Sequence, residues 1–128
     1  IAIYWAHYPQ YKKVENCEIT AICDIDEAVK AIILDTWTGR TGRYLAEFRP
    51  KVPIYAMCYN AFTMRELALT YDVYCYKFEI TGTKEGFVQN SLKILIADGK
   101  IAKGDLVGFI GGSFNDEVGA TYMEFKYV

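Results

Sequence analysis

The sequence predicts one α/β domain, in which a mostly parallel sheet carries helices on both faces. Short apolar stretches typical of strands alternate at least three times with stretches of helical periodicity. The length of 128 residues is close to that of a single domain, and a hydrophobic fraction of 52% suffices for a core of ordinary size. No internal repeat and no linker rich in Ser, Gly or Pro divides the chain.

The first half of the chain predicts two helices and two strands. From Glu18 to Lys30 the apolar residues recur at offsets of three and four, as on one face of a helix. The run AIILD is short, continuous and branched, which suits a strand covered on both faces. A later short helix stops before Arg49-Pro50, because proline disfavours a helical conformation in the preceding residue. The expected elements are a helix at 18–30, a strand at 31–35, a helix at 42–48 and a strand at 54–59.

The second half continues the alternation and ends in two strands. Asn60 is a suitable N-cap for the next helix, and Gly99 is a suitable left-handed residue after a longer one. The loop before the last strand has about ten residues, so the final two strands can pair antiparallel at one edge of the sheet. The expected elements are a helix at 61–69, a strand at 72–78, a helix from 84 to 98, a strand at 106–110, a loop at 111–120 and a strand at 121–128.

Composition excludes several classes of protein. The net charge of −2 is spread without a long run of either sign, which argues against a nucleic-acid interface or a polybasic membrane anchor. No uncharged apolar stretch is long enough for a membrane span, and the first residues lack the basic region of a signal peptide. We therefore expect a soluble cytoplasmic protein without nucleic-acid or membrane partners. The four cysteines lack zinc-site spacing and are expected to be buried, reduced thiols: Cys17, Cys23, Cys58 and Cys75.

The stretch DTWTGRT at 35–41 is the main candidate site. It follows a predicted buried strand and precedes a helix, at the edge where open α/β sheets bind ligands. A helix N-terminus supplies unpaired N–H groups, and Thr hydroxyls and an Arg side chain add donors for phosphate oxygens. The stretch is not a Walker A loop, and no GxGxxG motif follows a strand. On this pattern alone, a phosphate site and a polar loop whose threonines only cap the helix both remain open.

A family resemblance separates the two interpretations. The stretch 31–60 resembles the C-terminal domain of pyruvate kinases, in which a strand enters a loop of Thr, any residue, Ser or Thr, Gly, Arg or Lys, and Ser or Thr. An aromatic-Arg-Pro step, a Pro-Ile strand and a Lys-Gly-Asp turn follow in that family. The matching residues here are Thr36, Thr38, Gly39, Arg40 and Thr41, then Phe48-Arg49-Pro50, Pro53-Ile54, Asn60, and KGDLVGFIGG at 103–112.

The resemblance covers roughly residues 18–128 and implies both a fold and a function. It implies a three-layer α/β/α domain with a five-stranded mixed sheet whose last strand is antiparallel. In pyruvate kinases this domain binds phosphorylated allosteric effectors and contributes to tetramer contacts, without catalytic residues. Carried over by position, the effector phosphate would contact Thr36, Trp37, Thr38, Gly39, Arg40 and Thr41, and a second effector loop would contribute Gly112, Ser113 and Gly119.

This sequence departs from the family pattern in ways that concern the ligand. Trp37 stands where members that respond to fructose bisphosphate place a Lys, and Asp116 and Glu117 lie in a loop that is often basic in them. Like charges would repel a second phosphate group, so a sugar or nucleotide monophosphate, or phosphate itself, is expected. Trp37 either stacks on a ring of the ligand or packs at a domain or subunit contact.

The resemblance also implies a parent enzyme with a separate catalytic barrel. That barrel would hold the Lys, the acidic pair for Mg²⁺ and the K⁺ site of the glycolytic enzyme, which transfers phosphoryl from phosphoenolpyruvate to ADP. Residues 1–17 are then expected to be the remnant of a helix leading from the barrel, and residues 18–128 the effector domain. An alternative is an assembly module with a decayed effector site. A free-standing enzyme is a third hypothesis, for which only Asp35 is available as a nucleophile or base.

Overall fold

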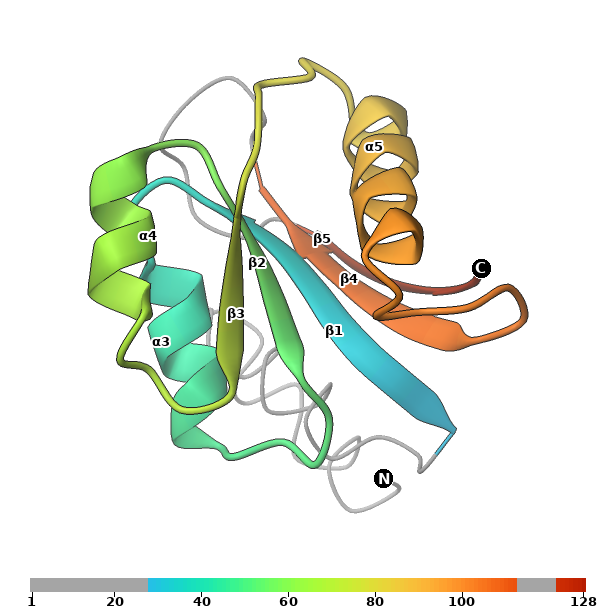
Figure 1. Ribbon diagram of the computed structural model, residues 1–128, viewed down its shortest axis with the longest axis horizontal. Coiled ribbons are helices and arrows are strands. Elements are labelled where there is room, and N and C mark those ends of the chain that lie inside the picture. The colour runs from blue at the N-terminus through green and yellow to red at the C-terminus, as the bar shows by residue number, and fades with distance from the viewer. Residues whose placement is uncertain (1–27, 113–121) are drawn as a thin grey trace.

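The computed structural model describes residues 28–112 and 122–128 of the chain. Figure 1 shows a sheet with helices on both of its faces. The elements, in chain order, are β1 (Val29–Thr36), α3 (Arg40–Glu47), β2 (Ile54–Cys58), α4 (Ala61–Leu67), β3 (Val73–Lys77), α5 (Lys84–Ala97), β4 (Leu106–Gly111) and β5 (Tyr122–Tyr127).

The five strands form one mixed sheet in the order β3-β2-β1-β4-β5. Strands β1 to β4 are parallel to one another, and β5 pairs antiparallel with β4. Helices α3 and α4 lie on one face, and α5 covers the other (Figure 1). The three-layer architecture with its antiparallel last strand, which the sequence and the resemblance predict, is confirmed.

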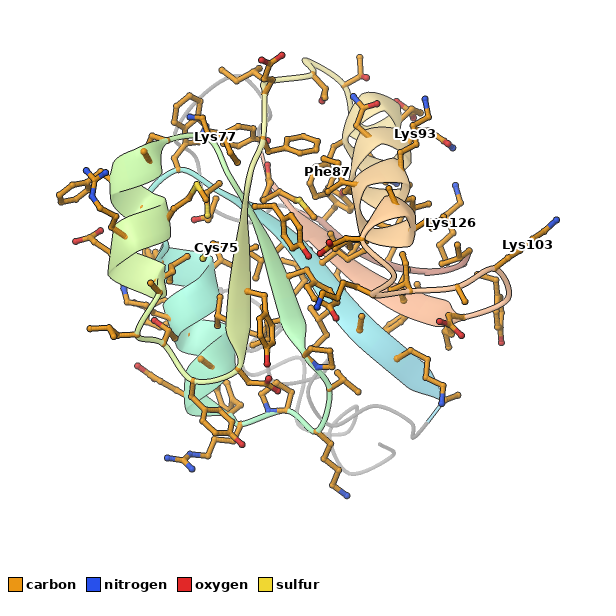
Figure 2. The ribbon with its side chains drawn as sticks, in the orientation of Figure 1. Cys75, Lys77, Phe87, Lys93, Lys103 and Lys126 are labelled. Carbon is orange, nitrogen blue, oxygen red and sulfur yellow. The ribbon has the colours of Figure 1, made fainter. Side chains whose placement is uncertain are left out.

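Two hydrophobic clusters fill the spaces between the layers, and β1 contributes to both. Ile32 and Leu34 belong to the cluster under α3 and α4, whereas Ala31 and Ile33 belong to the cluster under α5. Because successive side chains of a strand point to opposite faces, a strand covered on both faces is apolar throughout. Phe87 shows the α5 side of this arrangement, since it lies between α5 and the sheet (Figure 2) and is fully buried.

The prediction of a helix through residue 30 is wrong at its end. Val29 and Lys30 form the start of β1, where Val29 pairs with Leu106 of β4. The partner strand β4 lies far along the chain, so the periodicity of residues close to Val29 cannot predict this pairing. Residue 28 lies in a turn, and the remaining predicted helix at 18–27 and the predicted remnant at 1–17 lie outside the described residues.

Smaller corrections concern the ends of the helices. Helix α3 begins at Arg40, two residues earlier than predicted, and α4 ends at Leu67 rather than at residue 69. The step before Pro50 does leave the helical region, but Arg49 has a φ of 45° instead of an extended conformation. Its guanidinium lies 4.9 Å from the centroid of the Tyr71 ring, a stabilising contact in this strained position.

Candidate functional site

The candidate site lies at the point where the strand order reverses. The chain passes from β1 to β2 on one side, while β4 occupies the other side of β1. At such a point the connections leave in opposite directions, which opens a crevice at the carboxyl ends of the strands. The loop after Thr36 and the residue Gly112 after β4 both lie at this edge.

Threonine hydroxyls shape the turn between β1 and α3. The Gly39 N–H donates to Thr36 Oγ1 at 2.7 Å, and the Arg40 N–H donates weakly to Thr38 Oγ1 at 3.4 Å. Thr36 and Thr41 are buried, whereas Thr38 is exposed. The threonines therefore satisfy backbone N–H groups of the turn, as the polar-loop interpretation predicts, but they do not cap the helix.

The first turn of α3 has an unusual N-cap. Gly39 has a φ of 82°, in the left-handed region, and no side chain of the described residues caps the helix. An N-cap side chain normally accepts from the N2 or N3 amide, and glycine has no side chain that could do so. The positive end of the α3 dipole lies at this edge, where backbone N–H groups of a helix N-terminus can donate to an anion.

Two arginines lie near this turn. Arg40 is exposed, and its guanidinium lies 5.4 Å from the centroid of the Tyr44 ring. Arg43 was not among the predicted site residues, yet a Cβ on Gly39 would lie only 2.9 Å from Arg43 Nη1. Its spacing of four residues from Gly39 places both on one helix face, so this signal was present in the sequence. Arg43 also pairs loosely with Glu66 of α4, at 3.9 Å.

Trp37 is held inside the loop by contacts within the chain. Its ring packs on that of Tyr59, with centroids 4.7 Å apart, against the cluster under α5. Its carbonyl accepts hydrogen bonds from Asn60 Nδ2 at 2.8 Å and from Thr63 Oγ1. The indole N–H is buried and has no acceptor among the described residues. Stacking on a ligand and packing at a subunit contact both stay predictions for Trp37, although Tyr59 already occupies one part of its surface.

Asp35 is a buried carboxylate beside the loop. One oxygen accepts the Tyr59 hydroxyl at 2.8 Å, and the other accepts the Gly112 N–H at 3.1 Å. Desolvation by burial raises the pKa of Asp35 above its ordinary value, although both hydrogen bonds act in the opposite direction. Because the side chain is only 8% exposed and both oxygens are engaged, it is a poor candidate for a nucleophile or base.

The second predicted loop is described only at its first residue. Gly112 is buried and joined to Asp35, so the structure brings it to the end of β1. Ser113 and Gly119 lie outside the described residues, as do Asp116 and Glu117.

The cysteines that can be described are free thiols in or near the core. Cys58 is buried and Cys75 is half-buried, on adjacent strands (Figure 2 labels Cys75). Burial raises the pKa of the Cys58 thiol to about 12, so it stays protonated at neutral pH. Cys17 and Cys23 lie outside the described part of the chain. No helix in that part is both long and apolar enough to cross a membrane.

Comparison with known proteins gives consistent matches. The family described as "Pyruvate kinase, alpha/beta domain" matches residues 3–123, which begins before the domain boundary predicted at residue 18. The pyruvate kinase of Borreliella burgdorferi is 36% identical in an alignment 117 residues long, which covers 88% of this chain and 24% of that protein. The pyruvate kinase of Geobacillus stearothermophilus is 32% identical over 95 residues, which are 74% of this chain and 16% of the relative.

Solved structures agree at the level of the fold. A crystal structure of a pyruvate kinase from Cryptosporidium parvum superposes with a TM-score of 0.73 at 24% identity, covering 88% of this chain and 22% of that one. The chain thus spans a quarter or less of the length of these proteins. The order of the strands, the loop after β1 and the match over nearly the whole sequence lead to one conclusion: the chain belongs to the pyruvate kinase family and corresponds to its C-terminal alpha/beta domain.

Proposed function

We propose that the loop at 36–41 binds the phosphate group of an allosteric effector. The observation that carries this proposal is the first turn of α3, which lies at the reversal of the strand order and has no side-chain cap among the described residues. A phosphate oxygen there would accept from backbone amides at the positive end of the helix dipole. The threonine hydroxyls add donors, because a hydroxyl that accepts one bond still has a proton to donate.

The positive charge of the site comes from the exposed arginines. Arg40 stands at the position that the family resemblance assigns to the phosphate, and Arg43 lies beside Gly39 on the same helix face. A guanidinium can form paired hydrogen bonds to phosphate oxygens. Trp37 stands where family members that respond to fructose bisphosphate place a Lys, so one positive charge is missing here. Asp35 adds a buried acidic group next to the loop. These features favour a sugar monophosphate or inorganic phosphate over a bisphosphate.

The parent polypeptide is proposed to be a glycolytic pyruvate kinase. It would transfer phosphoryl from phosphoenolpyruvate to ADP on a separate barrel domain, where we also place the Mg²⁺ and K⁺ sites. The present domain would regulate that reaction from the effector loop. A homotetramer in the cytoplasm is the assembly that we propose for the parent.

Thermal unfolding with inorganic phosphate tests the site. A ligand at a hundred times its Kd stabilises a protein by about 2.7 kcal/mol, which shifts the Tm by several degrees. We expect such a shift for the wild-type chain and its loss in Arg40→Ala. Arg65→Ala is the matched control, because it removes an exposed arginine from the neighbouring helix α4. If phosphate protected the wild type and both variants equally, phosphate would not bind at the loop.

Subunit assembly is the alternative function, and one observation supports it. Strand β5 lies at an edge of the sheet, and its Tyr127 is 70% exposed. An edge strand with exposed aromatic side chains can pair with another chain. Sedimentation with and without phosphate separates the two functions. Association that is independent of phosphate, in a chain that phosphate does not protect from heat, would favour the assembly module.

A further inference from the structure

The backbone pairing between β1 and β4 ends before the candidate site. The last pair of the β1–β4 ladder is Leu34 with Ile110, whereas β1 and β2 remain paired as far as Thr36 with Cys58. At the end of β1, the two sides of the crevice therefore differ. Backbone pairing holds the β2 side, whereas on the β4 side Gly111 pairs with Tyr122 of the outer strand β5 and is no longer paired with β1. A contact between β1 and the residue after Gly111 therefore needs another group.

The Asp35 carboxylate provides that support. It accepts the N–H of Gly112, a residue 77 positions away in the sequence, and holds it at the end of β1. Its second oxygen accepts the hydroxyl of Tyr59, the residue that follows β2. One side chain on the central strand thus connects the ends of both neighbouring strands across the point where the strand order reverses.

Packing fixes the position of this carboxylate relative to the phosphate loop. The Tyr59 ring lies between those of Trp37 and Phe78, with centroids at 4.7 and 6.2 Å. Thr36, which accepts the Gly39 N–H, follows Asp35 directly in the chain. A shift of Asp35 would therefore move the phosphate loop and Gly112 together.

Folding alone does not require a carboxylate at this position. Burying an ionised carboxylate costs free energy that its hydrogen bonds recover only in part, and apolar residues of similar volume often serve stability as well or better. The neighbouring β1 residues that face α5, Ala31 and Ile33, are apolar. The Asp35 carboxylate instead accepts the Gly112 N–H across the crevice, and this hydrogen bond fixes the position of Gly112.

We propose that Asp35 is a positioning residue of the phosphate site, which fixes Gly112 relative to the loop at 36–41. The proposal deepens the proposed function and rests on it for its consequence on binding. Asp35 itself does not contact the phosphate. It sets the separation between the two segments that the ligand would meet, and that separation determines how well their donors converge on one anion.

Two substitutions separate the position of the side chain from its charge. Asp35→Asn retains the bridge, because the amide oxygen can accept from Gly112 and the amide nitrogen can donate to the Tyr59 oxygen. Asp35→Ala removes the bridge. We expect phosphate affinity to fall about tenfold in the Ala variant, and to stay within about twofold of wild type or to tighten in the Asn variant. If the Ala variant does not fold, Asp35→Val takes its place, because Val has no polar atom and its branched side chain suits a strand.

The amide resonance of Gly112 tests the bridge directly, and the phosphate affinities of the variants test its consequence for binding. In the wild-type chain its chemical shift should titrate with Asp35, at a midpoint above the ordinary value of about 3.9. The other described groups that interact electrostatically with this carboxyl are Tyr59 and Tyr122, and burial raises the pKa of both phenols, so they stay protonated in this range. In Asp35→Asn the titration should disappear while the hydrogen-bonded shift remains.

The outcomes distinguish this proposal from the proposed function. Phosphate affinity unchanged in the Ala or Val variant but lost in Arg40→Ala would overturn the positioning role and leave the phosphate site in place. Absence of phosphate binding by the wild type would overturn the phosphate site and, with it, the effect of Asp35 on affinity. The hydrogen bond between Asp35 and Gly112 would itself be overturned if the Gly112 amide did not titrate in the wild type and had the same chemical shift in the Ala variant.

Discussion

Helices α3 and α4 follow adjacent strands and begin at the same edge of the sheet, but their N-termini are built differently. Asn60, the N-cap of α4, has an extended backbone, and its side chain accepts the Thr63 N–H at 2.8 Å. Gly39, the N-cap of α3, has a left-handed backbone, and no described side chain caps the helix. Helix α5 resembles α4, since Thr83 accepts the Gly86 N–H.

The difference indicates that the N-termini of α3 and α4 have different roles. The cap of α4 satisfies its own helix and also supports the neighbouring loop, because Asn60 Nδ2 donates to the Trp37 carbonyl. The loop before α3 is thus supported by a side chain of the α4 cap, whereas no described side chain caps α3 itself. The α4 end serves stability, and the α3 end is the one at which we propose the phosphate site.

The largest effect on stability is expected from Gly39→Ala. A non-glycine residue at positive φ costs about 1–2 kcal/mol, and the new Cβ would lie 3.2 Å from Cγ of the fully buried Leu67. We expect a loss of about 2 kcal/mol in urea unfolding. Gly99→Ala is the control, because Gly99 has a φ of 72° but nothing within 4 Å of its Cβ position. Equal losses in the two variants would mean that the contact with Leu67 does not matter.

A smaller effect is expected from Asn60→Ala. The substitution removes the α4 cap and one of the two donors to the Trp37 carbonyl, so we expect a loss of about 1.5 kcal/mol. Thr83→Ala removes a cap without a second contact to the loop after β1, and should cost about 1 kcal/mol. Phosphate protection should weaken in the Asn60 variant and persist in the Thr83 variant. Equal protection in both would show that Asn60 acts only as a cap.

The contrast between local and long-range signals also explains which elements were predictable. The apolar run of β1, the Asn60 cap and the Gly99 terminus depend on residues close in the sequence, and the structure confirms each of them. The start of β1 at Val29 depends on pairing with Leu106, and periodicity there favoured a helix. The early start of α3 at Arg40 depends on the left-handed turn at Gly39, which composition alone does not reveal.

The candidate site was predictable in its chemistry but not in its geometry. The sequence by itself determined the fold class, because alternating apolar periodicities are local, and the order of hydroxyls, glycine and arginine that marks the loop after β1. Only the tertiary structure decided that Asp35 would meet Gly112 from 77 residues away and that Trp37 would pack on Tyr59. Such contacts depend on strand order and on side-chain packing, and neither is encoded in neighbouring residues.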